Sequence, residues 1–239
     1  MEFTYPNIIH SSEQRLQLTS TRLRRIGFSL IELLAVIAIV GILAAILIPA
    51  ISSVRKRASS AASVTNLRSV GVAMHLYMQE HDNYLPGPIK NGQLPYYGTA
   101  AYLDSQLPNF LYPYLDVPSA TQPKQAFSVF TFPGYLEHDP EMKGPAYFAT
   151  TSVVINGVRR NPWGYANSDP AKAGSPLRLL SLPDIDANSV MLLTEVDQQY
   201  PEVLGGSAGW YTLLSPTPYH GHIRNQLFLD GSVKAVDAQ

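Results

Sequence analysis

The apolar positions of this chain are concentrated in one stretch near its N-terminus. Residues 28–51 contain a single charged residue, Glu32, and otherwise consist almost entirely of Leu, Ile, Ala, Val, Phe and Gly. As a helix with a rise of about 1.5 Å per residue, this run spans about 36 Å, enough to cross a hydrocarbon core of about 30 Å. The alternative is a buried helix of a soluble protein, but such helices seldom stay apolar on every face for so long. The pattern therefore predicts a membrane-spanning helix.

The chain continues in a helical pattern beyond this run, now with one apolar face. Pro49 does not have to end the helix, because neighbours in a membrane can satisfy the carbonyl that a proline leaves free. We expect one helix from Phe28 to about His81, about 80 Å long, which ends before Pro86 because the residue preceding a proline avoids the α conformation. Its second half presents apolar residues at intervals of three or four, which predicts packing on a sheet: Val64, Leu67, Val70, Gly71, Met74, Tyr77 and Met78.

The remaining residues, 83–239, have the composition of a globular head rich in turns. Seventeen of the 19 prolines lie from Pro86 onward, and residues 84–126 predict loops with one short helix near 106–115. Asp230-Gly231 is the strongest hairpin signal and predicts a type I′ turn with positive φ at both residues. Five segments rich in β-branched and aromatic residues predict strands: Phe127–Phe132, Tyr147–Ile155, Val190–Val196, Asn225–Leu229 and Val233–Val236.

Composition and charge narrow the function classes. The chain has 239 residues, no cysteine, a formal net charge of −1 and 15% charged residues, against about 25% in an average globular protein. The absence of cysteine excludes a Cys/His zinc site and a disulfide-stapled domain. The near-zero net charge gives no basic excess for nucleic acid, and we expect no nucleic-acid partner.

A basic leader and a short motif precede the apolar run. Residues 1–27 carry four arginines against two glutamates, and Arg24 and Arg25 stand almost directly before the run. Gly27–Glu32 reads Gly-Phe-Ser-Leu-Ile-Glu. An ordinary secretory signal has a shorter apolar segment and an A-x-A-like cleavage site. The order of basic residues, Gly-Phe, Glu and a long apolar helix instead resembles the cleavage signature of type IV prepilins and type II secretion pseudopilins.

This resemblance implies how the N-terminus is processed and assembled. A membrane peptidase would cut between Gly27 and Phe28 and methylate the new N-terminus, leaving 212 residues with a net charge of −3. Glu32 of one subunit would pair with the Phe28 amine of a neighbour, which removes two unpaired charges from a low-dielectric environment. The alternative places Glu32 at the bilayer edge, where its carboxylate reaches the headgroups.

The implied architecture is an α+β, pilin-like fold in four parts. These are a leader (1–27), a membrane and assembly helix (28–51), its amphipathic continuation (52–82) and a head (83–239) with a small, mainly antiparallel sheet and a C-terminal hairpin. The resemblance implies a single-pass inner-membrane protein, its N-terminus cytoplasmic before cleavage and its head periplasmic or carried on an extracellular filament. The implied partners are a prepilin peptidase, other copies or paralogous pilin-like subunits, the inner-membrane assembly platform and membrane lipid.

The expected function is therefore that of a structural subunit of a type II secretion pseudopilus or a type IV-like pilus. The alternative is a membrane-anchored surface or periplasmic binding module that uses the leader without forming filaments. Exposed aromatic residues could stack on sugars or polymers in such a module, although core packing is the simpler expectation for each of them: Tyr96, Tyr97, Trp163, Trp210 and Tyr211.

A second motif lies near the C-terminus. His220 is followed after nine residues by Asp230-Gly231, which resembles the His-X9-Asp-Gly domain paired with prepilin leaders in paralogous sets of planctomycete- and verrucomicrobia-like bacteria. The C-terminal disulfide of type IVa pilins is absent, which favours a pseudopilin. We expect His220, Asp230 and Gly231 to be structural, because Asp in such a turn bonds local backbone and His220 ends a proline-rich loop.

The head offers few residues for chemistry. Acidic and imidazole groups could gather at one sheet edge and bind a metal such as calcium, as the heads of some pseudopilins do. We find no dense ligand loop and no nucleophile beside a general base, and we therefore expect no cofactor and no enzymatic activity. The weak metal candidates are Glu195, Asp197, His220 and Asp230, with His222 as a further polar candidate.

Overall fold

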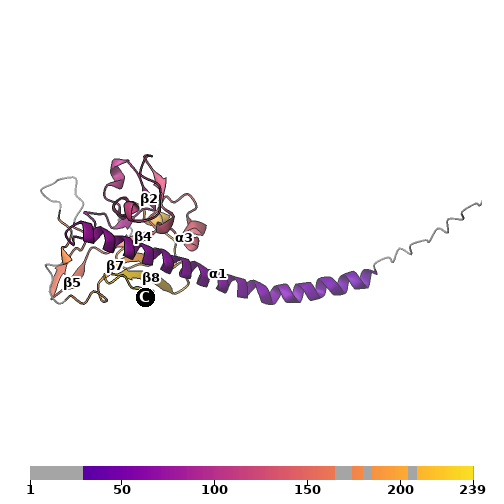
Figure 1. The fold of residues 1–239 in the computed structure, drawn as a ribbon. Helices are drawn as coiled ribbons and strands as arrows, with labels where there is room; N and C mark the ends of the chain where they lie inside the picture. Colours follow the sequence, from indigo (N-terminus) through magenta and orange to yellow (C-terminus); the bar gives the residue numbers. More distant parts are fainter. Residues whose placement is uncertain (1–28, 165–173, 180–184, 204–208, 239) are drawn as a thin grey trace, which may run out of the picture. The chain divides into compact units, whose positions relative to one another are not determined.

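The fold begins with one long helix. A computed structural model describes residues 29–164, 174–179, 185–203 and 209–238 (Figure 1). By its internal contacts the chain divides into two units, Met1–Leu47 and Ile48–Gln239. Helix α1 (Leu30–Glu80) is continuous through Pro49, as the sequence predicts. It contains an 18-residue window of mean hydropathy 3.0, and its length and composition suit a membrane span.

Helix α1 ends in a left-handed turn made by two short polar residues. The carbonyl of Met78 accepts hydrogen bonds from the backbone N–H groups of His81 (3.2 Å) and Asn83 (2.9 Å). Asp82 and Asn83 have φ values of 50° and 60°, which Asp and Asn tolerate better than most residues. The helix therefore ends within a residue of the predicted position, and the cap precedes Pro86.

The head is built on one antiparallel sheet of five strands in the order β1-β4-β7-β8-β9. The second half of α1 lies against this sheet, and its apolar stripe joins the same buried cluster as Leu193 and Leu227 (Figure 1). A Cβ atom on Gly71 would lie 3.1 Å from Leu227 Cδ1, so glycine lets the helix approach closely. The five strands are β1 (Gly92–Gln93), β4 (Tyr147–Ala149), β7 (Met191–Glu195), β8 (Ile223–Phe228) and β9 (Val233–Asp237).

Short elements surround the sheet. The predicted helix near 106–115 is present as α2 (Leu107–Leu111) followed directly by the 3-10 turn η2 (Tyr112–Tyr114). Two small two-stranded pairs, β2 with β3 and β5 with β6, accompany the main sheet. The other short elements are β2 (Tyr96–Tyr97), η1 (Ala101–Leu103), β3 (Gln125–Ala126), η3 (Ser128–Phe130), α3 (Pro133–His138), β5 (Val153–Ile155), β6 (Val158–Arg160) and η5 (Tyr211–Leu213).

Two strand predictions are wrong, one in the type of element and one in its extent. Phe127–Phe132 is not a strand, because it forms η3 and leads into α3 at Pro133. Its aromatic residues serve the core instead: the rings of Phe127 and Phe130 stack with centroids 5.4 Å apart. Tyr147–Ile155 is not one strand but two, β4 and β5, which belong to different sheets. Apolar content alone does not distinguish these cases from continuous strands.

The hairpin turns also differ from prediction. Phe228 O accepts a hydrogen bond from Gly231 N, and Phe228 N donates to Ser232 O, which encloses a three-residue loop. Gly231 has a φ of 80°, while Asp230 is not among the described residues with positive φ. A type I turn closed by a left-handed glycine fits this pattern, so the predicted type I′ turn is wrong here. Both residues of a two-residue loop, Asn156 (50°) and Gly157 (75°), have positive φ between β5 and β6.

Candidate functional site

The N-terminal site is described from Ser29 onward, and Gly27 and Phe28 lie outside the described residues. Glu32 stands in the first turn of α1, where its Oε2 accepts a hydrogen bond from the backbone N–H of Ser29 at 2.9 Å. Leu33 N in turn donates to Ser29 O at 3.1 Å. Ser29 and Glu32 thus occupy the first and fourth positions of a capping-box sequence, and Glu32 satisfies one donor at the helix start. The carboxylate therefore has a local structural role besides the pairing that the sequence predicts.

The large apolar side chains in the first half of α1 are exposed. Within the most hydrophobic window of the helix no side chain is buried. Because apolar surface in contact with water is unfavourable, an exposed apolar surface of this length is expected to be surrounded by lipid or by other protein. The large apolar side chains exposed by half or more from Leu30 to Ile48 are Leu30, Ile31, Leu33, Leu34, Val36, Ile37, Ile39, Val40, Ile42, Leu43, Ile46, Leu47 and Ile48.

The head holds a second carboxylate in the opposite environment. Glu195 ends β7 and is 1% exposed. Its Oε1 accepts from Ser63 Oγ of α1, from His220 Nε2 at 2.9 Å and from Asn225 Nδ2 at 3.1 Å, and its Oε2 accepts from Asn225 N at 2.9 Å. All these neighbours can present donors, which is the arrangement an acceptor-only carboxylate requires. Glu195 thereby joins the helix, the last hairpin and the loop before it.

Ser63 links this network to β4. Its hydroxyl lies 3.5 Å from the hydroxyl of Tyr147, and burial raises the pKa of Tyr147 above its usual range. Tyr147 therefore keeps its proton and can donate to Ser63, while Ser63 donates to Glu195. Asn225 extends the network to Ser60, whose Oγ lies 3.2 Å from Asn225 Nδ2. The second half of α1 is fixed to the sheet by these polar contacts as well as by its apolar stripe.

His220 contacts Glu195 and does not contact Asp230 within hydrogen-bonding distance among the described residues. Its ring packs on Phe132, with centroids 5.5 Å apart, and its buried Nδ1 has no hydrogen-bond partner among the residues that the structure describes. Glu195 stands between Ser63 and His220. A nucleophilic hydroxyl needs its base in direct contact. Here the Glu195 carboxylate lies between the Ser63 hydroxyl and the His220 imidazole, so Ser63 and His220 do not form such a pair.

The other polar candidates occupy separate places. Asp197 is buried and forms a two-point ion pair with Arg224, with distances of 2.6 and 2.9 Å. Asp230 is exposed on the hairpin turn, where its Oδ1 accepts from Ser232 N at 2.9 Å. His222 is exposed and lies 3.7 Å from Asp237. No group of three or more His, Cys, Asp or Glu residues that could hold a metal occurs in the described part of the chain.

The aromatic residues considered for surface binding are mostly inside the head. Tyr96, Tyr97 and Trp163 are buried and therefore do not offer stacking faces to a polymer. Trp210 and Tyr211 are half-buried and pack against the cluster around Phe148. Packing in the core explains the presence of Tyr96, Tyr97 and Trp163.

Sequence reasoning missed four members of the polar network, Ser60, Ser63, Tyr147 and Asn225. It also missed Arg224, which pairs with Asp197. For Ser63 a signal was present in the sequence, because Ser59, Ser63 and Leu67 follow one another at intervals of four residues and so share one helix face. Both serines are buried in the structure. A hydroxyl in register with a buried stripe predicts a polar partner across the interface. Arg224 and Asn225 carry no comparable signal. Neighbouring residues of a strand point to opposite faces of the sheet, so the sequence pattern gives no reason to expect both of these polar residues to be buried, as they are.

The comparison with known families concerns the N-terminal part of the chain. Residues 22–48 match the family described as Prokaryotic N-terminal methylation motif. The chain is 43% identical over 61 residues to the type IV major pilin protein PilA of Myxococcus xanthus, covering 26% of this chain and 28% of that protein. It is 43% identical over 58 residues to the type IV wide pilus major component PilA4 of Thermus thermophilus, covering 24% of this chain and 44% of that protein.

These matches define what is shared. The chain aligns with less than half of the length of either pilin, and no solved structure matches it significantly. The family model covers the methylation motif and the beginning of the long helix, and the structure adds an antiparallel sheet packed on that helix. By motif, helix and α+β architecture, the chain is a prepilin-like protein.

Proposed function

We propose that the chain is the precursor of a pilin-like structural subunit. A prepilin peptidase cuts it between Gly27 and Phe28 and methylates Phe28, and the mature chain then assembles with other pilin-like subunits. The observation that carries this proposal is the apolar half of α1, which contains part of a methylation motif and whose most hydrophobic window has no buried side chain. Lipid surrounds this surface before assembly, and neighbouring subunits surround it afterwards.

Glu32 has a specific part in this proposal. A lone carboxylate in an apolar helix is costly in lipid, and the Ser29 N–H contact leaves one carboxylate oxygen available. The new α-amino group of a neighbouring Phe28 supplies the missing positive charge. The cap to Ser29 and the pairing with a neighbour are compatible, because a carboxylate accepts at both of its oxygens.

The head is proposed to be a structural domain without a cofactor or an enzymatic activity. Supporting this, the donors around Glu195 come from its own chain, and Asp197 is paired with Arg224. The filament is either a type II secretion pseudopilus or a type IV-like pilus. The absence of cysteine, and with it of a C-terminal disulfide, favours the pseudopilus.

The test is whether cells producing the chain form filaments that carry this head. Filaments are sheared from the cells, pelleted and labelled with an antibody against residues 83–239. The proposal predicts the processed chain in the sheared fraction and label along the filaments. A chain that is processed but stays entirely in the membrane fraction contradicts subunit function and favours an anchored binding module.

A further inference from the structure

Three basic residues follow the apolar half of α1 directly. Arg55, Lys56 and Arg57 are exposed, and none of them makes a salt bridge within the described residues. No carboxylate occurs on α1 between Glu32 and Glu80. The triplet is therefore a concentrated positive charge that its own helix does not balance.

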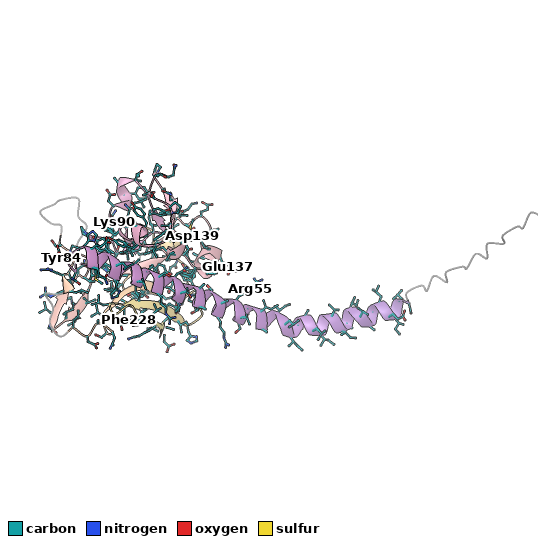
Figure 2. The ribbon with its side chains drawn as sticks, viewed as in Figure 1. Arg55, Tyr84, Lys90, Glu137, Asp139 and Phe228 are labelled. Atoms are coloured by element: carbon teal, nitrogen blue, oxygen red, sulfur yellow. The ribbon has the colours of Figure 1, made fainter. Side chains whose placement is uncertain are left out.

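Two grooves flank the helix at this level, and Lys56 lines both. The first lies between α1 and the segment entering β8, and Arg57, Ser60 and His222 also line it. The second lies between α1 and α3, and Arg55, Ile51 and Glu137 line it (Figure 2). Figure 2 labels Arg55 on the helix and Glu137 on α3.

The lining of the second groove changes from apolar to basic along the helix. Ile48 and Ile51 line it first, and Arg55 and Lys56 follow one turn later, about 6 Å further along the axis. An anionic phospholipid has the same order, with apolar chains beneath a negative phosphate. The exposed isoleucines are 68% and 49% accessible, so their apolar surface is available to acyl chains.

The charges facing the grooves favour an anion. Glu137 is the acidic residue in the lining of the second groove, against two cations. In the first groove the lining includes Lys56, Arg57, His220 and His222, while Asp237 lies 3.7 Å from His222. His220 already contacts Glu195, so Lys56 and Arg57 supply the available positive charge there.

We propose that Arg55, Lys56 and Arg57 form a docking surface for the headgroup of an anionic phospholipid. The inference rests on the proposed membrane insertion of residues 28–51. In that arrangement the triplet emerges at the membrane surface, where each basic residue near an anionic leaflet strengthens binding about fivefold. The surface holds the base of the head against the bilayer until the subunit is drawn into a filament.

The proposed topology places the basic triplet on the head side of the membrane, where a negatively charged partner would compensate an unfavourable charge distribution. Basic residues flanking a span favour the cytoplasmic side, and the proposed topology places this triplet on the opposite side. Anionic headgroups in the facing leaflet offset that bias by attraction. A carboxylate-rich protein surface could also supply negative charge, and the experiment distinguishes the two.

The experiment uses the full chain in lipid nanodiscs. The chain has no native cysteine, so Ala61→Cys gives a single attachment point for an environment-sensitive fluorophore at the rim of the first groove. The label is followed while phosphatidylglycerol replaces phosphatidylcholine from 0 to 50%. We expect a saturable change in the wild-type background that shrinks at high salt, because added ions screen surface charge.

Matched variants test the assignment. Arg55→Gln/Lys56→Gln/Arg57→Gln should lose the response by more than a hundredfold in apparent affinity. Arg55→Lys/Arg57→Lys keeps the charge and should respond like wild type. Arg68→Gln/Lys90→Gln/Arg159→Gln removes the same charge from exposed positions that line neither groove and should also respond like wild type.

Each contrary outcome has a distinct meaning. A Gln triple variant whose fluorescence responds like wild type overturns the lipid site. A wild-type fluorescence change that depends on the number of protein chains per nanodisc, and not on the phosphatidylglycerol content, also overturns it. Flotation with neutral vesicles tests insertion separately. If the chain floats but ignores phosphatidylglycerol, the lipid site fails alone; if it does not float, the membrane-anchored function fails as well.

Discussion

The two halves of α1 place a carboxylate in opposite settings. Glu195, which the second half of the helix helps to bury, receives donors from Ser63, His220 and Asn225 of its own chain. Glu32, at the start of the first half, receives only the Ser29 N–H within the described residues and lies on the apolar half of the helix, whose most hydrophobic window has no buried side chain. A carboxylate satisfied within its chain stabilises the fold, whereas an unsatisfied one on an apolar surface indicates a partner outside the chain.

The largest expected effect concerns processing. Gly27→Lys should abolish cleavage, because the peptidase must approach a residue that has no side chain. The precursor would keep all 239 residues instead of 212. Immunoblotting of membranes resolves the two forms, and a variant that is cut as efficiently as wild type would show that Gly27 does not define the cleavage site.

Glu32 substitutions separate its two roles. Glu32→Ala should be processed and inserted, since removing a charge eases insertion, yet it should fail to assemble. Glu32→Gln keeps a capping side chain and removes the charge, so it should also fail if pairing with the Phe28 amine is what matters. Sheared filament yield is the measurement. Assembly by Gln but not by Ala would assign Glu32 to helix capping, and assembly by both would make it a tolerated edge charge.

Glu195→Ala should destabilise the head strongly. The change removes the acceptor shared by Ser63, His220 and Asn225, and each buried donor left without a partner costs roughly 1–3 kcal/mol, so the three together cost at least about 3 kcal/mol. The melting temperature of the detergent-solubilised chain, followed by circular dichroism, should fall by roughly 6–20 °C. The exposed Glu137→Ala is the matched control and should change little. Equal melting of the two variants would refute the structural role of Glu195.

His220→Ala should have a smaller effect of the same kind. It removes one hydrogen bond to the Glu195 carboxylate, a loss of roughly 1.5–3 kcal/mol, which lowers the melting temperature by about 3–10 °C. The melt is repeated with a chelator. Two results would assign His220 to a ligand site instead: a His220→Ala variant that melts at the wild-type temperature, or a wild-type protein whose melting temperature falls with chelator by as much as the substitution lowers it.

Asp230→Ala should have the smallest effect, because the side chain is exposed. The hydroxyl and backbone N–H of Ser232 hold the pKa of Asp230 below its usual 3.8. A lowered folded-state pKa contributes stability above about pH 3.8 that is lost as the pH falls toward the folded value. The difference between wild type and variant, no more than about 1 kcal/mol, should therefore vanish in acid melts. A difference that persists there would mean that the carboxylate charge is not its source.

The regular parts of the fold could be predicted from the sequence. The long helix, its buried stripe from Leu67 to Met78, β7 and the last hairpin each follow from local periodicity and turn residues. Phe127–Phe132 could not be predicted, because a run of buried aromatic residues packs equally well from a 3-10 turn. The break between β4 and β5 likewise depends on pairing with β7, which lies far away in the sequence.

The candidate sites divide in the same way. Gly27, Phe28 and Glu32 belong to a contiguous motif, so their roles can be proposed directly from the sequence and stay predictions. The partner of His220 could not, since Glu195 lies 25 residues away and the conspicuous spacing leads to Asp230 instead. Only the tertiary fold shows that the histidine and the aspartate of that motif serve different contacts.

The most direct test of this account is the N-terminus of the chain recovered from cell membranes. Intact mass and N-terminal sequencing should give a chain that begins at Phe28 and carries one N-methyl group. A mature chain that begins at Met1, or one cut after Ala45, would contradict the account, because the apolar helix would then be either unprocessed or removed as an ordinary signal sequence.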